Sequence, residues 1–142
     1  MFLLDPAFLV TSEPLASLRL CDARLQGDAR FPWIVLIPRA AGAAEIEDLA
    51  PENRAALLDE TLLAGQAVRA VGHALGRPVA KLNVGQLGNI TRQLHVHVVG
   101  RRPDDAAWPG PVWGHGTAAP YSGPALAQAL EAARTVLSFG AS

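Results

Sequence analysis

Apolar side chains recur at spacings of seven, four, three and four residues within the segment from Pro51 to Leu75. They are Leu57, Ala64, Val68, Val71 and Leu75. This spacing places them along one face of an α-helix, and such a face has to be buried against another part of the chain. Pro51 suits the first turn of a helix, and Gly76 followed by Pro78 ends one. We predict one long helix over residues 51–75, with the rest of the fold built around it.

The segments on either side of this helix have the composition of β-strands. Before it, residues 17–25 alternate in part between apolar and polar side chains, and residues 31–38 form the denser run "FPWIVLIP". Gly27 and Asp28 lie between the two runs and tolerate turn conformations, so an antiparallel hairpin is the simplest connection. The second run is apolar enough to be buried on both faces. After the helix, "VAKLNVGQLGN" and "QLHVHVV" predict a second pair of strands.

A second amphipathic helix is predicted near the C-terminus, at about residues 124–137. The segment before it, residues 103–124, is rich in proline, glycine and tryptophan and is expected to be irregular but ordered. At 142 residues the chain fits a single domain. We therefore expect an α+β fold over residues 1–142, with an antiparallel sheet, one long helix and a C-terminal helix. Its core is expected at about residues 15–114.

The charge balance and composition exclude several classes of protein. The 12 basic side chains are matched by 13 acidic ones, which argues against a surface that binds nucleic acid. No run approaches the roughly 20 apolar residues that span a bilayer, and the start "MFLLDPAFLV" lacks the basic region of a signal peptide. The single cysteine, Cys21, rules out an internal disulfide and fits a reducing compartment. We expect a soluble cytoplasmic protein.

His95 and His97 occupy alternate positions of the predicted strand "QLHVHVV". Successive side chains of a strand point to opposite faces, so both imidazoles share one face with Gln93. Three interpretations are open from the residues alone: buried structural histidines, a metal site, or a histidine nucleophile. A metal ion needs further ligands, but the other histidines are only His73 and His115. No Asp or Glu lies within the ten residues before His95.

The nucleophile interpretation needs both an oriented imidazole and donors for an anionic substrate. A neutral imidazole attacks phosphorus near pH 7 if a hydrogen bond holds the proton on one ring nitrogen and leaves the other lone pair free. The loop before the histidines offers donors for phosphate oxygens, because glycines let backbone N–H groups approach and amide side chains donate. These residues are Asn83, Gly85, Gln86, Gly88 and Asn89.

Together these motifs resemble the histidine-triad (HIT) family of nucleotide hydrolases and transferases, whose motif is His-x-His-x-His followed by two apolar residues. In "QLHVHVV", His95 falls on the middle histidine of the motif, His97 on the third and Gln93 on the first. "FPWIVLIP" resembles the family's core strand, "LNVGQLGN" its Asn-x-Gly segment, and "WPGPVWG" a Trp-Pro segment after the motif. The resemblance covers residues 30–114.

The resemblance implies a hydrolase or transferase that cleaves a dinucleoside polyphosphate or a nucleoside phosphoramidate at the α-phosphate. His95 would attack phosphorus, water would release the nucleotidyl-histidine intermediate, and His97 and Gln93 would complete the catalytic set. The substrate-binding residues would be Asn83, Gly88 and Asn89. The family generally forms homodimers, and most of its branches need no metal in the chemical step. No cofactor is expected.

Two positions depart from the family pattern. Gln93 keeps hydrogen-bonding capacity but cannot carry a positive charge or shuttle a proton. With glutamine at this position, the chain resembles a branch of bacterial HIT-like proteins that is related to diadenosine polyphosphate hydrolases. The residue that grips the ribose in many members falls near Leu25, so Asp28 is expected either to replace it or to serve only as a turn residue. The alternatives are a nucleotide-binding protein with little or no catalysis and a histidine-based metal-binding protein.

Overall fold

The computed structural model describes residues 1–140 of the chain. The predicted domain of residues 1–142 also includes Ala141 and Ser142, which lie outside the described residues. In chain order the elements are α1 (Pro6–Thr11), β1 (Ser12–Ser17), β2 (Cys21–Gln26), β3 (Trp33–Pro38), the 3-10 helix η1 (Ile46–Asp48), α2 (Pro51–Ala74), β4 (Lys81–Gly85), β5 (Val96–Arg101) and α3 (Gly123–Leu137).

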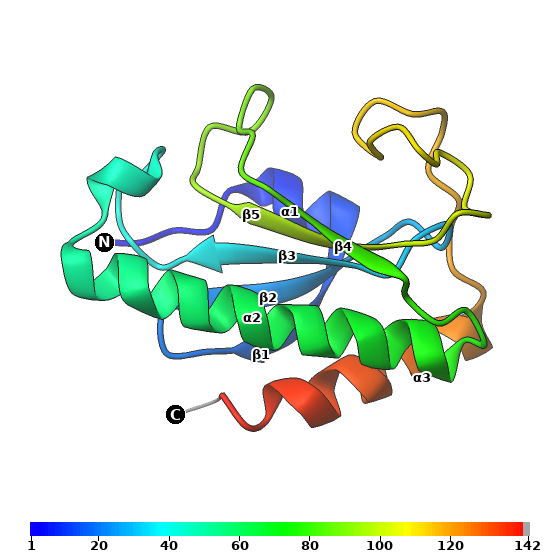
Figure 1. Ribbon diagram of the computed structural model, residues 1–142. Coiled ribbons are helices and arrows are strands. Elements are labelled where there is room, and N and C mark those ends of the chain that lie inside the picture. The colour runs from blue at the N-terminus through cyan, green and yellow to red at the C-terminus, as the bar shows by residue number, and fades with distance from the viewer. Residues whose placement is uncertain (141–142) are drawn as a thin grey trace.

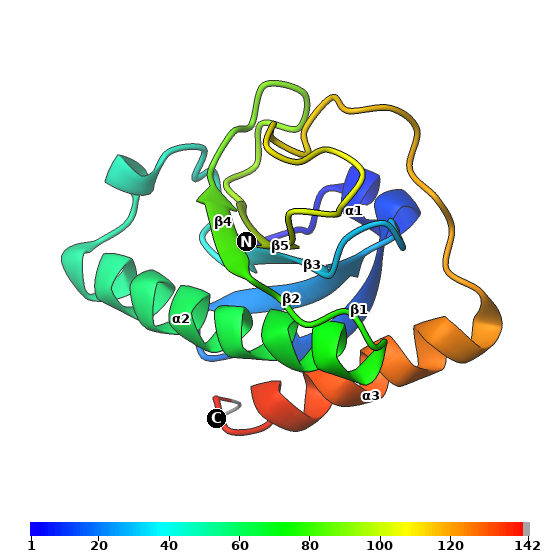
Figure 2. The same ribbon diagram turned by 45° about the vertical axis from the view of Figure 1, so that its right-hand side comes forward.

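The five strands form one antiparallel sheet in the order β1-β2-β3-β5-β4. Helices α2 and α3 cover one face of this sheet, and the short α1 lies on the other (Figures 1 and 2). All six residues of the central strand β3 are buried, as its apolar sequence predicts. The expected α+β fold with one long helix and a C-terminal helix is confirmed.

The long helix α2 begins at Pro51, as predicted, and ends at Ala74. Its apolar stripe packs on side chains from β3 and β5, which include Ile34, Leu36 and Val98. The buried members of the stripe are Leu57, Ala64, Val68 and Val71. The helix therefore forms the core with the face of β5 that points away from the two histidines.

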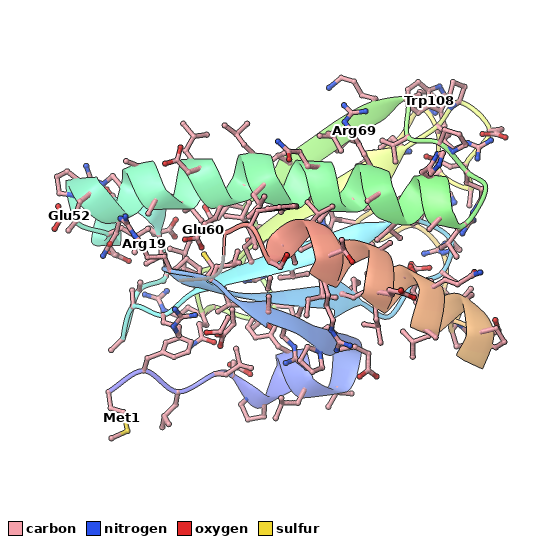
Figure 3. All side chains as sticks on the ribbon, turned by 90° about the horizontal axis from the view of Figure 1, so that it is seen from below. Met1, Arg19, Glu52, Glu60, Arg69 and Trp108 are labelled. Carbon is pink, nitrogen blue, oxygen red and sulfur yellow. The ribbon has the colours of Figure 1, made fainter. Side chains whose placement is uncertain are left out.

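Glu60 is a buried acidic residue within this apolar stripe of α2 (Figure 3). Its carboxylate accepts hydrogen bonds from the backbone N–H groups of Leu20 and Cys21, both at 2.9 Å. These bonds satisfy a charge that would otherwise be costly to bury. Glu60 thereby ties the turn between β1 and β2 to the long helix.

The strand predicted over residues 17–25 is wrong at its start. β1 ends at Ser17, residues 18–20 make a turn closed by a 2.8 Å hydrogen bond from Leu18 N–H to the Cys21 carbonyl, and β2 begins at Cys21. Leu18 and Leu20 are buried although they lie in a turn, so their apolar side chains imitate the alternation of a strand. The predicted antiparallel hairpin between β2 and β3 is confirmed.

The N-terminal residues form α1 and β1, which the sequence patterns did not predict. Asp5 caps α1 by accepting a hydrogen bond from Ala7 N–H at 2.9 Å, and Pro6 takes the first helical position. A helix of six residues is too short to show a period. Phe8 of α1 packs on the sheet face opposite α2, in a second apolar cluster with Trp33 and Val99.

Strand β5 begins at Val96, so the predicted strand starts three residues too early and His95 lies just before it. The predicted alternation still holds. Val96 and Val98 face α2, whereas His97 lies on the opposite face of the sheet, with Val35 of β3 and Gly85 of β4 as its neighbours across the ladder. The histidines therefore lie on the face that carries α1.

The helix α3 confirms the predicted C-terminal helix, and residues 103–122 before it are irregular, as expected. Buried residues also extend beyond the expected core of residues 15–114. They are Phe8 in α1, Ser12 in β1, and Ala129, Ala133 and Leu137 in α3. Over residues 1–140, no helix combines the length and the apolar character needed to cross a membrane.

Candidate active site

A cavity of about 380 Å³, which we call the histidine cavity, opens on the sheet face that carries α1. His95 and His97 both line it, together with residues of α1, the end of β2, the loop after β4 and Trp113. In the described part of the chain, these two histidines are the only lining residues with an acidic or basic side chain. The chemistry of the cavity therefore depends on the state of the two imidazoles.

His95 is buried, with 6% of its surface exposed. Its Nδ1 lies 2.7 Å from the backbone carbonyl oxygen of Gln93. A carbonyl oxygen only accepts hydrogen bonds, so Nδ1 carries the proton and the lone pair is on Nε2. The edge of the Phe8 ring packs against the imidazole at a centroid distance of 5.0 Å. His95 is thus held in the tautomer that a histidine nucleophile requires.

His97 is held in the opposite tautomer. The indole Nε1–H of Trp33 donates to its Nδ1 at 3.0 Å. Indole nitrogen is a donor only, so Nδ1 of His97 must carry the lone pair and Nε2 the proton. Burial, and to a smaller extent the neighbouring His95, lowers the pKa of His97 to about 4. At neutral pH His97 is an uncharged hydrogen-bond donor.

The rings of His95 and His97 are neighbours, with centroids 4.9 Å apart and planes at 78°. The pair therefore offers one free lone pair and one free N–H to the same cavity. A lone pair can attack an electrophile, and an adjacent N–H can stabilise the negative charge that develops beside it. This combination suits nucleophilic substitution at a phosphorus centre.

Trp113 packs against the other side of His97, at a centroid distance of 5.6 Å. Gly85, which pairs with His97 across the ladder, leaves room for the indole. A Cβ at residue 85 would lie 2.9 Å from Cη2 of Trp113. Gly85, expected from the sequence to let backbone approach a phosphate, instead makes space for the tryptophan that flanks His97.

Gln93 does not line the histidine cavity with its side chain. Its Oε1 accepts a hydrogen bond from Asp5 N–H at 2.8 Å, and its Nε2 donates to the Leu3 carbonyl, also at 2.8 Å. The side chain therefore holds the segment that leads into α1, and Ala7, Phe8 and Thr11 form part of the cavity wall. Only the backbone carbonyl of Gln93 reaches His95.

The loop after β4 lies where the sequence places it, beside the histidines. Gly88 and Asn89 both line the histidine cavity, as do Ile90 and Thr91. Gly88 has a φ of 85°, a conformation that favours glycine because it has no Cβ. The loop can thus present backbone and side-chain donors to a ligand held near His95.

Asn83 and Asp28, the other two predicted substrate-binding residues, do not line the histidine cavity. Oδ1 of Asn83 accepts a hydrogen bond from Nη1 of the buried Arg101 at 2.8 Å. Asp28 is also buried, and it forms an ion pair with Arg30 at 2.8 Å. Burial opposes ionisation of Asp28, but hydrogen bonds from Arg30 and Ala119 outweigh it and lower its pKa. Both residues are engaged within the fold.

Gln26, at the end of β2, lines the histidine cavity and was missed from the sequence. Leu25, where the family pattern places the ribose contact, is fully buried in the cluster under α2. Because adjacent residues of a strand face opposite ways, Gln26 faces the side of the sheet that carries the histidines. The alternation of side chains along the strand could have predicted this position of Gln26, because the neighbouring Leu25 is apolar and buried.

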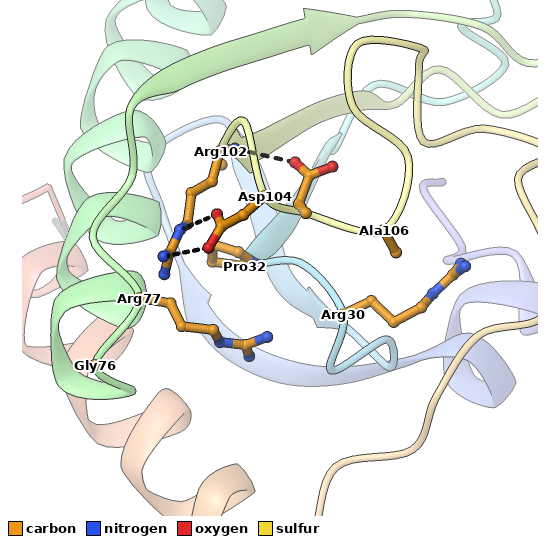
Figure 4. Close-up of a pocket in the computed structure, with 9 residues that line it drawn as sticks. Arg30, Pro32, Gly76, Arg77, Arg102, Asp104 and Ala106 are labelled. Atoms are coloured by element: carbon orange, nitrogen blue, oxygen red, sulfur yellow. Dashed lines mark hydrogen bonds and ion pairs between the residues drawn. The ribbon is translucent and has the colours of Figure 1, made fainter.

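A second cavity, of about 360 Å³, is lined by three arginines and shares no lining residue with the histidine cavity (Figure 4). Its guanidinium groups are engaged by the protein itself. Arg30 pairs with Asp28 and Arg102 with Asp104, while Arg77 donates to the carbonyl of Ala29 at 2.8 Å. Two of the three positive charges are thus paired with carboxylates, and no histidine or cysteine is in the described lining of this cavity.

Metal binding would need at least one more ligand near the two histidines. Among residues 1–140, no group of three or more His, Cys, Asp or Glu side chains is placed to hold a metal ion.

An antiparallel sheet covered by one long helix, with one histidine just before a strand and a second within it facing a single cavity, is the arrangement that the HIT resemblance predicts. A model of the HIT domain matches residues 10–104, and the chain belongs to the HIT family. This family includes nucleotide hydrolases and also members without catalysis. A search of curated protein sequences found no significant match.

Three crystal structures of bacterial histidine-triad proteins are similar to the chain over nearly its whole length. One from Sinorhizobium meliloti 1021 is 39% identical, with 96% of this chain and 98% of that chain covered and a TM-score of 0.86. One from Marinobacter aquaeolei VT8 is 35% identical over 99% of each chain, with a TM-score of 0.89. One from Bradyrhizobium japonicum is 32% identical over 94% and 96%, with a TM-score of 0.87.

Proposed function

We propose that the protein hydrolyses or transfers nucleotides at the α-phosphate through a nucleotidyl-histidine intermediate on His95. The observation that carries the proposal is the pair of opposite tautomers, with Nε2 of His95 unprotonated and Nε2 of His97 protonated beside the same cavity. Substrates of this chemistry are dinucleoside polyphosphates and nucleoside phosphoramidates, as in the branch related to diadenosine polyphosphate hydrolases.

The reaction proceeds in two substitutions. The lone pair of His95 Nε2 forms a bond to the α-phosphorus, and the bond from phosphorus to the leaving group breaks with its electron pair. Water then attacks phosphorus, the P–N bond breaks, and its electron pair returns to Nε2 of His95. One water proton passes to solvent, and a nucleoside 5′-monophosphate leaves. In both steps the Nε2–H of His97 donates to phosphate oxygens.

The remaining residues of the site have binding or positioning roles in this proposal. Gly88 and Asn89 contact the phosphate, and Gln26 takes the ribose contact that was expected of Asp28. Gln93 acts through its backbone carbonyl, which fixes the proton on Nδ1 of His95. Asn83 supports the strand pair through Arg101 and does not touch the substrate.

We also propose that the protein is a homodimer. Strand β4 is at the edge of the sheet, and an unpaired edge is prone to pair with another chain. Val84 of β4 and Leu58 and Leu62 of α2 are large apolar side chains that are more than half exposed. Burial of this surface against a second copy would remove it from water. Sedimentation equilibrium measures the oligomeric state.

The cytoplasm is the proposed compartment, and nucleotides rather than nucleic acids are the proposed ligands. Cys21 is fully buried and free, which suits a reducing environment. The histidine cavity has no arginine or lysine in its described lining, whereas nucleic-acid surfaces depend on such cations.

The deciding experiment compares wild type, His95→Ala and His73→Ala on one panel of nucleotide substrates. The panel contains diadenosine polyphosphates, adenylyl anhydrides and adenosine phosphoramidate. Loss of the nucleophile is expected to reduce turnover by several orders of magnitude. His73 is an exposed histidine on α2 and serves as the matched control.

Acid-sparing electrophoresis should trap a nucleotidyl adduct on wild type but not on His95→Ala. Equal activity of His95→Ala and wild type would end the proposal. Saturable nucleotide binding with neither turnover nor adduct would assign the protein to nucleotide binding alone.

A further inference from the structure

The hydrogen bonds around the two imidazoles leave the site without an obvious acid. The protonated Nδ1 of His95 donates a hydrogen bond to the Gln93 carbonyl, and the lone pair on Nε2 is the proposed nucleophile. The Nδ1 lone pair of His97 accepts a hydrogen bond from the indole N–H of Trp33. Trp33 lies 64 residues before His97, on the neighbouring strand β3, and its ring edge packs on the imidazole at 5.6 Å.

For His97 to become a cation it would have to take a proton at Nδ1. That lone pair already accepts a hydrogen bond from the Trp33 N–H. Protonation of Nδ1 would break this bond and leave two N–H donors, one on each ring, facing each other. The rings that face His97 are those of His95, Trp33 and Trp113, and none of them carries a negative charge that would stabilise an imidazolium. No carboxylate in the described lining of the cavity is placed to stabilise an imidazolium.

Gln93 cannot supply the missing proton. It occupies the position of the first histidine of the family motif, but an amide is not an acid. Both atoms of its amide are also engaged, with Asp5 N–H and with the Leu3 carbonyl. The described lining of the cavity contains no Asp, Glu, Lys, Arg, Tyr or Cys that could act in its place.

We infer that Trp33 holds His97 as a neutral donor, and that the site therefore expels only leaving groups that depart as stable anions. These are the carboxylate, sulfate or phosphate groups of nucleotide anhydrides. An amine is a poor leaving group unless it is protonated, so nucleoside phosphoramidates are excluded as efficient substrates. This inference rests on the proposed function and narrows its substrate class.

The chemical step balances without a general acid. The Nε2 lone pair of His95 forms the N–P bond, and the P–O bond to the leaving group breaks with its electron pair on the departing oxygen. The N-phosphorylated imidazole gains one positive charge, and the leaving group carries one negative charge away. The N–H of His97 stays on nitrogen throughout and only donates a hydrogen bond to a phosphate oxygen.

The first test is a series of aryl esters of adenosine 5′-monophosphate with phenols of graded acidity, assayed beside an adenylyl anhydride and adenosine phosphoramidate. Rates should fall steeply as the phenol becomes less acidic. The phosphoramidate should react about 100- to 10,000-fold more slowly than the anhydride, the usual contribution of a general acid. A shallow dependence on the phenol, or comparable rates for phosphoramidate and anhydride, would overturn the inference but leave the proposed function standing. No turnover of any compound would overturn both.

The second test reads the tautomer directly by ¹⁵N NMR of the imidazoles. In wild type, His97 should show a protonated Nε2 and an unprotonated Nδ1. Trp33→Phe removes the donor but keeps an aromatic ring, and it should give a mixture of tautomers and a higher pKa for His97. The same variant should raise phosphoramidate turnover relative to anhydride turnover, a change that loss of packing alone would not produce.

Trp113→Phe is the matched control for the NMR measurement. Its ring also packs on His97, but its indole makes no hydrogen bond to Nδ1, so the His97 tautomer should stay as in wild type. A wild-type spectrum with the proton on Nδ1 of His97 would refute the role of Trp33 whether or not any variant folds.

Discussion

The side-chain amide of Gln93 binds the backbone of Asp5, 88 residues earlier in the chain, at 2.8 Å. Gln93 thus joins the segment that carries His95 and His97 to the N-terminus, and its amide does not line the histidine cavity. The N-terminal segment in turn brings Phe8 against the imidazole of His95. Gln93 therefore connects the two histidines to the part of the cavity wall that α1 forms.

Gln93→Met should loosen the N-terminal segment, because methionine keeps the length of the side chain but loses both hydrogen bonds. Each bond contributes about 1 kcal/mol, so amide exchange at Asp5 should accelerate by roughly 30-fold. Nucleotide affinity should weaken more than the maximal rate, because His95, the proposed nucleophile, is unchanged. Hydrogen exchange with mass spectrometry checks the first effect. Gln66→Met, an exposed glutamine on α2, is the control, and equal exchange in the two variants would contradict the role of Gln93.

The low pKa of His97 predicts how stability depends on pH. Its pKa is about 4 in the folded protein and near 6.5 in an unfolded chain, so between these values the unfolded state binds more protons. The contribution of His97 to the free energy of unfolding is therefore fully present above pH 6.5, and it is lost as the pH falls through about 4. Urea unfolding of wild type and His97→Asn across this range should show a smaller acid loss in the variant. Parallel curves would argue against a neutral, partly buried His97.

The sequence predicts best those features that depend on neighbouring residues. The 24-residue helix α2 has enough turns for its period to be unambiguous, and β3 is a continuous apolar run between turn residues. Helix α1 is too short for either signal. The turn at residues 18–20 was hidden because its leucines are buried like those of a strand. The carboxylate that binds the backbone of this turn belongs to Glu60, 40 residues after Leu20.

The candidate site could be located from the sequence, but the roles within it could not. The positions of His95 and His97 follow from strand alternation. Their tautomers depend on which groups lie beside Nδ1, and for His97 that group is Trp33 on another strand. Gln26 was missed because the ribose contact was counted along the chain, whereas the face of the strand decides which side chain reaches the cavity.

Asp105 should be a stabilising residue of the loop after β5. Burial raises its pKa, but hydrogen bonds from Arg101 and from three backbone N–H groups outweigh burial and lower it to about 2. Asp105→Ala leaves the buried Arg101 without its carboxylate and should cost about 3 to 5 kcal/mol of unfolding free energy. Asp104→Ala is the control, since its largely exposed pair with Arg102 is worth less than about 1 kcal/mol. Equal urea midpoints would contradict the assignment.

Gly85→Ala should displace Trp113 from His97. The backbone of Gly85 needs no left-handed conformation, so the effect of the added methyl group is steric: it would lie 2.9 Å from Cη2 of the indole. Overpacking of this kind costs about 1 to 3 kcal/mol. Near-UV circular dichroism should report the altered indole, and nucleotide affinity should fall because Trp113 lines the cavity. Gly123→Ala is the matched control, because a Cβ there meets nothing within 4 Å. If both variants kept the wild-type spectrum and affinity, the packing of Trp113 on His97 would have no part in shaping the site.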